Sequence, residues 1–299
     1  GNALRIVRPM VSRLLLIGMM LGGGFAGAAA FAQEAAPEPA APAAAEEFSP
    51  RPVTTWLEAQ VELHRRGFSC GSIDGVAGPQ TVAALRAFQR SAYLEETGTL
   101  NPETRENLLL TEPPLTTHTL TTEELAALAP LPDTWLDKSE RDRLGFATAL
   151  GLVGEKYRAS PRFLQRLNPG VSWDDLLPGT TVQVPAVGEF YPTARAAHLH
   201  VKLAERILQV NDAEGRLIAH FPVSIARSVD KRPVGELHVV VVIEDPNYTF
   251  DPAVFPESEE GRTLGRRLIL APGPNNPVGV AWIGLDRPGY GIHGTPDPE

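Results

Sequence analysis

Residues 67–89 read GFSCGSIDGVAGPQTVAALRAFQ, a stretch that turns sharply and then becomes regular. Asp74 precedes a glycine, and an Asp-Gly pair marks a tight turn. Pro79 suits the first position of a helix, because the backbone N–H of that position has no partner within the helix. Leu85 and Phe88 then recur at helical spacing. The stretch therefore predicts a turn followed by an amphipathic helix.

Helical signals flank this stretch on both sides. Upstream, Thr55 can cap a helix in which Ala59 and Leu63 share a face. Downstream, Asn101 can cap a further helix that begins with a proline. Three short helices are therefore predicted between residues 54 and 110.

The elements I-D-G, G-x-x-T, A-L-x-x-F-Q and T-G-x-L occur here in that order. Together they resemble the three-helix peptidoglycan-binding module of bacterial wall enzymes. The resemblance covers residues 54–110 and implies peptidoglycan as a partner. Asp74 is interpreted as a turn residue and not as a catalytic carboxylate.

The composition limits the classes of partner. The chain has 299 residues and a formal net charge of −9 at pH 7, and Lys and Arg do not cluster with aromatic residues. A phosphate backbone attracts basic surfaces, so nucleic acid is not an expected partner. Cys70 is the only cysteine of the 299 residues, and its turn-like surroundings favour a small, inert side chain.

The N-terminus is typical of an exported protein. Three arginines precede an apolar run, and small residues follow as far as Ala32. This pattern predicts a signal peptide over residues 1–32 and a periplasmic, wall-associated protein. The apolar run is shorter than the roughly 20 residues that a membrane span needs, so no stable span is expected after cleavage. Residues 33–53 are rich in Ala, Pro and Glu and predict a disordered linker.

A second small unit is predicted over residues 146–187, after a linker at 111–145. A capped helix stops at residues 168–170, and residues 180–185 alternate as a strand. The strings YRASPRFLQRLNPG and LLPGTTVQVP are similar to the second half of a LysM module, a fold that holds N-acetylglucosamine chains. The opening strand of that family is not predicted before Phe146.

Alternation with period two marks the last third of the chain. Polar and apolar residues alternate over 198–203, and Asp212 begins a hairpin turn. The apolar run 237–243 predicts a buried strand, and the acidic residues 257–260 predict a solvated loop. We therefore expect a β-rich domain over residues 195–299.

Histidines on one strand face raise the alternative of a metal site. His198 and His200 alternate on a strand, so their imidazoles share a face, and His220, His238 and His293 could join them. Zinc-dependent wall hydrolases also carry peptidoglycan-binding modules. However, no H-E-x-x-H or comparable spacing occurs, and the outer face of a strand is polar in any case. The sequence therefore favours a site without metal.

Four short motifs follow one another near the end of the sequence. They are P-V-G at 233–235, N-P-V-G at 276–279, W-I-G at 282–284 and Y-G-I-H-G-T at 290–295. In this order they resemble the catalytic domain of L,D-transpeptidases, the YkuD family. The resemblance implies cysteine acyl transfer without metal or cofactor. In that chemistry a thiolate attacks the carbonyl of meso-diaminopimelate in a tetrapeptide stem, releases D-alanine and passes the acyl group to an amine.

The same resemblance implies roles for individual residues. His293 would accept the proton of the nucleophilic thiol. Five residues would contact substrate, namely Asn276, Tyr290, Gly291, Gly294 and Thr295. In the family an S-H-G-C-x-R motif supplies the nucleophile, and that motif does not occur in these 299 residues. We therefore expect the chain as given to be inactive, as a fragment truncated before the catalytic motif.

Together these features predict an α+β multidomain protein. It would contain a small three-helix peptidoglycan-binding domain, a small LysM-like helical unit and an incomplete, β-rich YkuD-like sandwich. We expect a peptidoglycan L,D-transpeptidase that forms 3-3 cross-links or attaches protein to the wall, with stem peptides and glycan strands as partners. Two alternatives are a non-catalytic peptidoglycan-binding protein and a zinc-dependent wall hydrolase. The sequence does not decide the oligomeric state.

Overall fold

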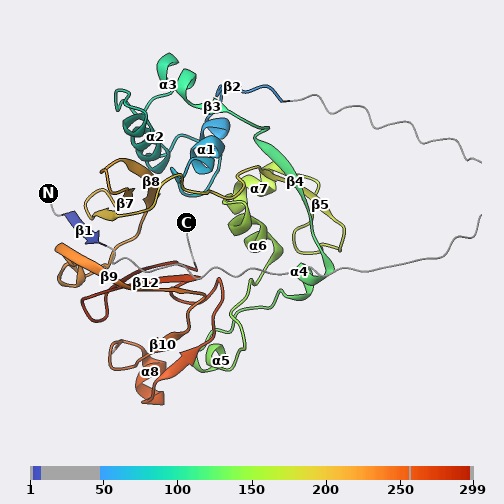
Figure 1. Ribbon diagram of the computed structural model, residues 1–299. Coiled ribbons are helices and arrows are strands. Elements are labelled where there is room, and N and C mark those ends of the chain that lie inside the picture. Colours follow the sequence, from blue (N-terminus) through green and yellow to red (C-terminus); the bar gives the residue numbers. More distant parts are fainter. Residues whose placement is uncertain (1–2, 8–47, 256, 297–299) are drawn as a thin grey trace, which may run out of the picture.

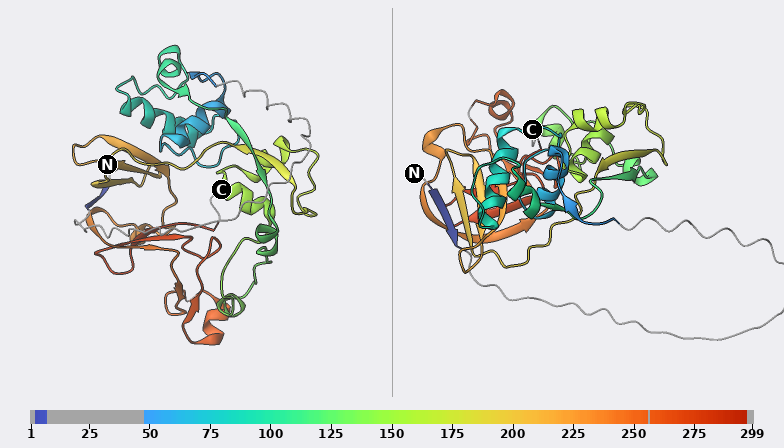
Figure 2. Two further views of the ribbon diagram at one scale, coloured as in Figure 1. Left: turned by 45° about the vertical axis from the view of Figure 1, so that its right-hand side comes forward. Right: turned by 90° about the horizontal axis from the view of Figure 1, so that it is seen from above.

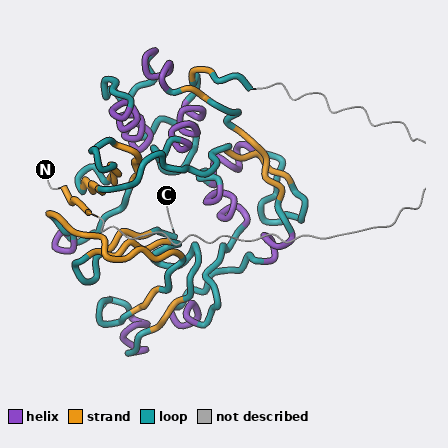
Figure 3. Tube along the Cα trace, viewed as in Figure 1, coloured by secondary structure: helices purple, strands orange, loops and turns teal. Residues whose placement is uncertain are grey.

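The computed structural model describes residues 3–7, 48–255 and 257–296 (Figure 1). Most of the predicted signal peptide and of the predicted linker after it lies outside the described residues. Within the described part, no helix has the length and apolar character needed to cross a membrane. Helices are concentrated in the first half of the described chain and strands in the second. Figure 3 shows the helices in purple and the strands in orange.

The first folded region consists of three helices closed by a short strand pair. The helices are α1 (Trp56–Arg65), α2 (Pro79–Ser91) and α3 (Pro102–Asn107). Strand β2 (Arg51–Pro52) pairs antiparallel with β3 (Leu109–Leu110), which joins the two ends of the region. The three predicted helices are confirmed, and the chain forms one small module.

The caps and the core of this module follow the sequence signals. The Thr55 hydroxyl accepts the N–H of Glu58, and the Glu58 side chain accepts the N–H of Thr55 in return, which completes a capping box. The Asn101 side chain accepts the N–H of Thr104 at the start of α3. The core contains, among others, the buried residues Ala59, Leu63, Leu85, Phe88 and Leu108.

The second unit contains a strand that the sequence analysis did not predict. Strand β4 (Leu115–Thr119) pairs antiparallel along its whole length with β5 (Thr181–Pro185). Helices α6 (Ala149–Lys156) and α7 (Pro161–Leu167) pack on this pair through a shared apolar cluster. The prediction that no strand precedes Phe146 is therefore wrong. Thr116 and Thr117 are adjacent polar residues, so the segment lacks the alternation of polar and apolar residues that would have predicted a strand.

The predicted linker over residues 111–145 is also structured in part. Besides β4 it contains α4 (Thr122–Ala126) and α5 (Trp135–Ser139). Both helices are short and begin at a threonine whose hydroxyl accepts a backbone N–H. Each lacks a full amphipathic period, so periodicity could not reveal them.

The rest of the described chain is dominated by a mixed seven-stranded sheet in the order β13-β12-β9-β1-β6-β7-β8. The strands are β1 (Ala3–Val7), β6 (His198–Lys202), β7 (Ile207–Asn211), β8 (Leu217–Pro222), β9 (Gly235–Glu244), β12 (Ala281–Leu285) and β13 (Gly291–His293). All neighbouring strands are antiparallel except β1 and β9, which run parallel. A single turn of 3-10 helix, η1 (Val229–Lys231), precedes β9. The predicted β-rich region is thus a sheet that also includes residues from the far N-terminus.

The predicted burial of residues 237–243 is wrong. Strand β9 forms there, but Val240 is 59% exposed and Val242 is 44% exposed. Only Val239 of the run 239–244 is buried. A continuous apolar run is typical of a strand covered on both faces, and this strand is covered incompletely.

A small lobe lies beside the sheet, at the bottom of Figure 1. It contains the antiparallel pair β10 (Tyr248–Phe250) and β11 (Leu268–Leu270) together with α8 (Glu259–Leu264). Trp135 of α5 stacks on Phe250, with the ring centroids 4.4 Å apart. Glu260 was predicted to lie in a solvated loop, but its carboxylate accepts two N–H groups from the first turn of α5.

The three-helix module is docked on the free edge of the sheet. The N–H of Ser69 donates to the carbonyl of His220 in β8 at 2.8 Å, and the N–H of His220 donates to the carbonyl of Gly67 at 2.9 Å. Figure 2 shows the module against β7 and β8 from two further directions. The turn after α1 thus covers an edge strand that would otherwise present unpaired backbone groups.

Candidate active site

The N-P-V-G and Y-G-I-H-G-T motifs meet at the end of the sheet. Gly279 ends the N-P-V-G motif in a left-handed conformation, with φ of +62°. A Cβ atom at this position would lie 2.8 Å from Cα of Gly294 in the H-G-T motif. The two backbones therefore touch, and only glycine permits both the dihedral angle and the contact. Segments separated in sequence are brought together here as one site.

Trp282 packs against His293 and against two glycines in the same region. It pairs with His293 across β12 and β13, and the two rings stack with their centroids 5.5 Å apart. A Cβ atom on Gly291 would lie 2.5 Å from the indole ring, and one on Gly284 would lie 3.0 Å from its Nε1. The glycines on both sides thus leave room for the indole. The indole in turn supports one face of the imidazole.

His293 is exposed at the end of β13 and has a defined tautomer. Its Nδ1 lies 2.7 Å from the carbonyl oxygen of Gly294. A carbonyl oxygen can only accept a hydrogen bond, so Nδ1 must carry the proton. In the neutral ring the lone pair is then on Nε2, the nitrogen that can accept a proton from a substrate or a nucleophile. The hydrogen bond and the Trp282 stack thus hold the imidazole in one orientation.

The predicted substrate-contacting residues differ in their accessibility. Tyr290, Gly291 and Gly294 are partly exposed, and Thr295 is exposed, so all four lie at the surface beside His293. Asn276 is completely buried. Its amide nitrogen donates to the carbonyls of Pro246 and Ala271, and its oxygen accepts the N–H of Val278. This geometry gives Asn276 a role in holding the loop and leaves it out of substrate's reach.

Cys70 lies far from this arrangement in the fold. It is 2% exposed and belongs to the apolar core of the three-helix module. Burial raises the pKa of the thiol to about 12. A thiolate is the reactive form of cysteine, so Cys70 is neither accessible nor ionised at neutral pH. The inert role predicted from its sequence surroundings agrees with this burial.

The histidines of the alternative zinc site do not gather into one cluster, although His198 and His200 are neighbours on β6 with their ring centroids 6.5 Å apart. No group of three or more His, Cys, Asp or Glu side chains that could hold a metal ion occurs among residues 3–7, 48–255 and 257–296. His220 is buried, and burial lowers its pKa to about 4. His238 pairs instead with Asp286, with Nδ1 2.9 Å from a carboxylate oxygen. The side chains described here give no support to a zinc centre.

The pair of His238 and Asp286 is distinct from the candidate site. His293 is paired with Trp282, which is itself paired with Ile243. Ile243 is five residues along β9 from His238, a distance of about 17 Å at roughly 3.4 Å per residue. The exposed His238 therefore serves as a matched comparison for His293.

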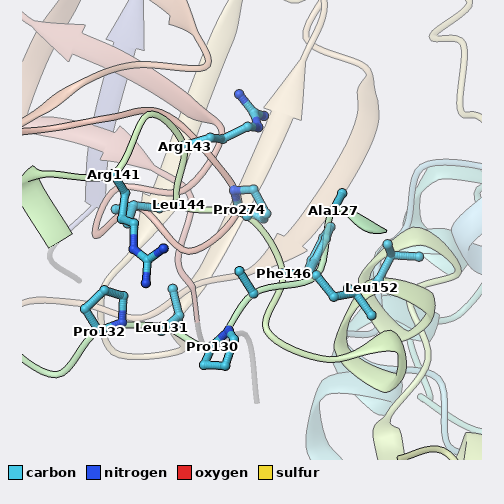
Figure 4. A pocket seen from close by; sticks show the side chains of 13 residues that line it. Ala127, Pro130, Leu131, Pro132, Arg141, Arg143, Leu144, Phe146, Leu152 and Pro274 are labelled. Carbon is cyan, nitrogen blue, oxygen red and sulfur yellow. The ribbon is translucent and has the colours of Figure 1, made fainter. Parts of the chain in front are cut away.

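Two cavities lie elsewhere in the described chain. One of about 360 Å³ lies between residues 127–146 and Pro274, with Arg141 and Arg143 at its side (Figure 4). Asn275 fixes this contact, because its amide donates to the carbonyl of Gly145 at 2.7 Å. The other, also about 360 Å³, lies beside α7 and is lined by residues that include Asn168 and Trp173. Neither cavity includes His293.

Two residues of the site were quoted in motifs without receiving a role. Trp282 supports the imidazole, and Gly279 touches Gly294. Their signal was present in the W-I-G and N-P-V-G motifs. A motif read along the chain does not show which residues meet across strands, so these roles required the structure.

Comparisons with known proteins found one family model and several relatives that match this chain. Residues 54–108 match the family model described as "Putative peptidoglycan binding domain". A Bacillus licheniformis protein named "Putative L,D-transpeptidase YkuD" is 23% identical over 147 residues, which cover 49% of this chain and 70% of that protein.

Two further relatives have corresponding names. The "Putative L,D-transpeptidase in ATP synthase subunits region ORF 5" of Fuscovulum blasticum is 28% identical over 154 residues, or 52% of this chain and 75% of that protein. The "Putative L,D-transpeptidase YkuD" of Bacillus subtilis is 21% identical over 149 residues, or 50% of this chain and 71% of that protein. The chain therefore joins a peptidoglycan-binding module to a region related to the L,D-transpeptidases of the YkuD type.

Proposed function

We propose that this chain belongs to an exported, periplasmic peptidoglycan L,D-transpeptidase, in which His293 is the general base of a cysteine acyl transfer. The enzyme would form 3-3 cross-links between stem peptides or attach a protein to the wall. The observation that carries the proposal is the state of His293. The imidazole is exposed, stacked on Trp282 and held with Nε2 as the free lone pair.

The chemistry follows from that free nitrogen. His293 Nε2 takes the proton of a cysteine thiol, and the thiolate attacks the carbonyl between diaminopimelate and D-alanine. The imidazolium returns this proton to the departing D-alanine amine as the peptide bond breaks, which leaves a thioester. An acceptor amine then attacks the thioester and gives its proton to Nε2. The thiolate departs and is protonated again, so the enzyme is unchanged.

The thiol in this proposal is not that of Cys70. Its burial and its raised pKa exclude the attack, since neither a stem peptide nor His293 can reach the module core. We propose that a cysteine in an S-H-G-C-x-R segment, outside these 299 residues, supplies the nucleophile. The 299-residue chain alone would then be inactive.

The helical regions would supply wall binding. A module that holds peptidoglycan raises the local concentration of stem peptides for a site on the same chain. The contact of residues 67–69 with β8 supports such coupling, because it fixes the module against the sheet. The cavity beside α7, with Asn168 and Trp173 in its lining, supports a further glycan contact in the LysM-like unit.

The rival function is wall binding without catalysis. Binding to purified sacculi does not separate the two proposals, because both require it. Acylation by a carbapenem does separate them, because the carbapenem forms a covalent adduct only with a reactive thiolate, whose formation requires the base. The test uses protein from the complete reading frame that contains these residues, followed by mass spectrometry of the intact protein.

We expect wild-type protein to gain the mass of one carbapenem. His293→Ala should slow this step by about 100-fold or more, as for loss of a general base. His238→Ala is the matched control, because it removes an exposed strand histidine elsewhere on the sheet. Near wild-type acylation of His293→Ala would remove the assignment as base, and no adduct on any variant would favour the binding protein.

A further inference from the structure

The seven-stranded sheet is continuous only through β1. Residues of β1 pair antiparallel with the whole of β6, from Ala3 opposite Lys202 to Val7 opposite His198. On its other side β1 pairs parallel with residues 235–238 of β9. In the part of the chain that the structure describes, no other strand pairs with both β6 and β9.

This strand therefore connects two functionally different halves. Strands β9, β12 and β13 form the half that carries His293. Strands β6, β7 and β8 form the half that is hydrogen-bonded to the peptidoglycan-binding module at residues 67–69. Without β1 the single sheet becomes two three-stranded sheets, which retain only the side-chain contacts of a common apolar cluster.

Among the described residues, β9 extends beyond the part that pairs with β1. On the side facing β1, residues 239–244 of β9 have no strand partner among the described residues. These residues read VVVVIE, and four of their apolar side chains are exposed. An apolar strand edge with unpaired backbone groups is a site for strand addition. The edge could therefore accept a strand longer than β1.

The connection of β1 to the rest of the sheet is also long, so the chain does little to hold β1 in its position. Strand β1 has five residues and precedes β6 by about 190 positions, so its pairing closes a very long loop. Most of that intervening chain forms its own helical units. Strands attached in this way open at lower free energy than strands joined by a hairpin, such as β7 and β8.

We propose that the position between β6 and β9 is a strand-acceptor site with an exchangeable occupant, here Ala3–Val7. While β1 is in place, the wall-binding half and the His293 half are one hydrogen-bonded sheet. When the N-terminal region is absent, β6 and β9 become open edges and the two halves are coupled by side chains alone. The sequence predicts cleavage after Ala32, which would produce this second state.

Hydrogen exchange measured by mass spectrometry tests this proposal with two nearly identical chains. One begins at Ala3 and the other at Arg8, so they differ only in the five residues of β1. In the shorter chain we expect those amides of residues 198–202 and 235–237 that face β1 to exchange at least about tenfold faster. The N–H of His238 donates to Asp286 and should not change. Amides of α1, α2, β7 and β8 should not change. A synthetic peptide of residues 1–9 should restore protection to the shorter chain.

Four results would overturn the proposal. Equal protection of the two chains would mean that β1 does not occupy the site. Loss of protection throughout β7, β8 and β12 would mean that β1 is an integral strand and not exchangeable. Failure of the peptide to restore protection would mean the same. A dimer of the longer chain, detected by light scattering, would mean that the strand comes from a second copy. No readout here depends on activity, so the proposed function can fail without affecting this result.

Discussion

The three-helix module and the seven-stranded sheet differ in how their backbone groups find hydrogen-bond partners and in how their apolar side chains are buried. In the module, buried polar side chains close the turns. The Gln60 amide, for example, makes five hydrogen bonds to the turn at residues 74–76 and to Thr81. In the sheet, β9 exposes apolar side chains and depends on a strand from the far N-terminus. The module is closed within residues 51–110, whereas the sheet requires distant segments.

This difference indicates which part of the molecule can change its connectivity. A unit closed by local contacts behaves as a rigid binding element, because its buried polar groups have partners within one short segment. A sheet joined by one distant strand can change its connectivity without unfolding its parts. We therefore expect substitutions in the module to act on stability as a whole, and substitutions in the sheet to act on the position of His293.

Replacing Gln60 should have the largest effect. Gln60→Leu removes the buried partner of backbone N–H and carbonyl groups in the partly buried turn, which should cost about 3 kcal/mol or more. The matched control is Gln80→Leu, the same change at an exposed position of α2, with an expected cost within about 0.5 kcal/mol. Urea unfolding followed by hydrogen exchange of α1 and α2 amides measures both. Equal effects would contradict the role of the buried amide.

Replacing either of two glycines in the sheet region with alanine should have the next largest effect on stability. Gly279 and Gly289 both have positive φ, at +62° and +78°, but a Cβ at 289 meets no atom within 4 Å. Gly289→Ala should cost only the conformational penalty, about 1–2 kcal/mol. Gly279→Ala adds a collision with the Gly294 backbone, for about 1–3 kcal/mol more.

Thermal unfolding measures both variants, and the fluorescence of Trp282 reports the site. Only Gly279→Ala should change the fluorescence, because its neighbour Gly294 follows the histidine that stacks on Trp282. A similar change in Gly289→Ala would show that the contact does not position the imidazole.

Acid should weaken the module through Glu58. The hydrogen bond from Arg51 lowers the pKa of this carboxyl from 4.5 to about 2. A lowered folded-state pKa stabilises the fold above about pH 4.5, and this stabilisation is lost as the pH falls toward 2. Because Arg51 is partly exposed, we expect a loss of about 1–2 kcal/mol. Unfolding at pH 6 and pH 2.5 measures it, and Glu58→Gln should show a smaller difference between the two conditions.

The ion pair between Arg143 and Asp245 should have the smallest effect. Both side chains are largely exposed, so Arg143→Ala should cost less than about 1 kcal/mol. The contact of this segment with the sheet region rests instead on buried groups, such as the Leu144 backbone. Urea unfolding of Arg143→Ala checks this. A cost above 2 kcal/mol would mean that the pair holds the segment in place.

Local signals made most of the helical fold predictable. The predicted caps at Thr55 and Asn101 lie at the helix starts of the structure. Strand β4 was missed because its threonines do not alternate clearly with apolar residues. The exposure of β9 was missed because a sequence does not show how much of a strand its neighbours cover.

The position of His293 in the candidate site was predictable from the sequence, but the residues that support it were not. His293 follows from its motif, and the structure adds the tautomer and the Trp282 stack. Asn276 was expected at the substrate, yet its amide is fully used within the loop. A polar residue inside a motif can serve the fold as easily as the ligand, and only its hydrogen bonds distinguish the two roles.

Release of D-alanine from a tetrapeptide stem tests the central claim most directly. The measurement compares wild type, His293→Ala and Cys70→Ser, each expressed from the complete reading frame. We predict full release by Cys70→Ser, because the buried thiol takes no part, and at least about a 100-fold loss in His293→Ala. Abolished release in Cys70→Ser with full release in His293→Ala would contradict the account.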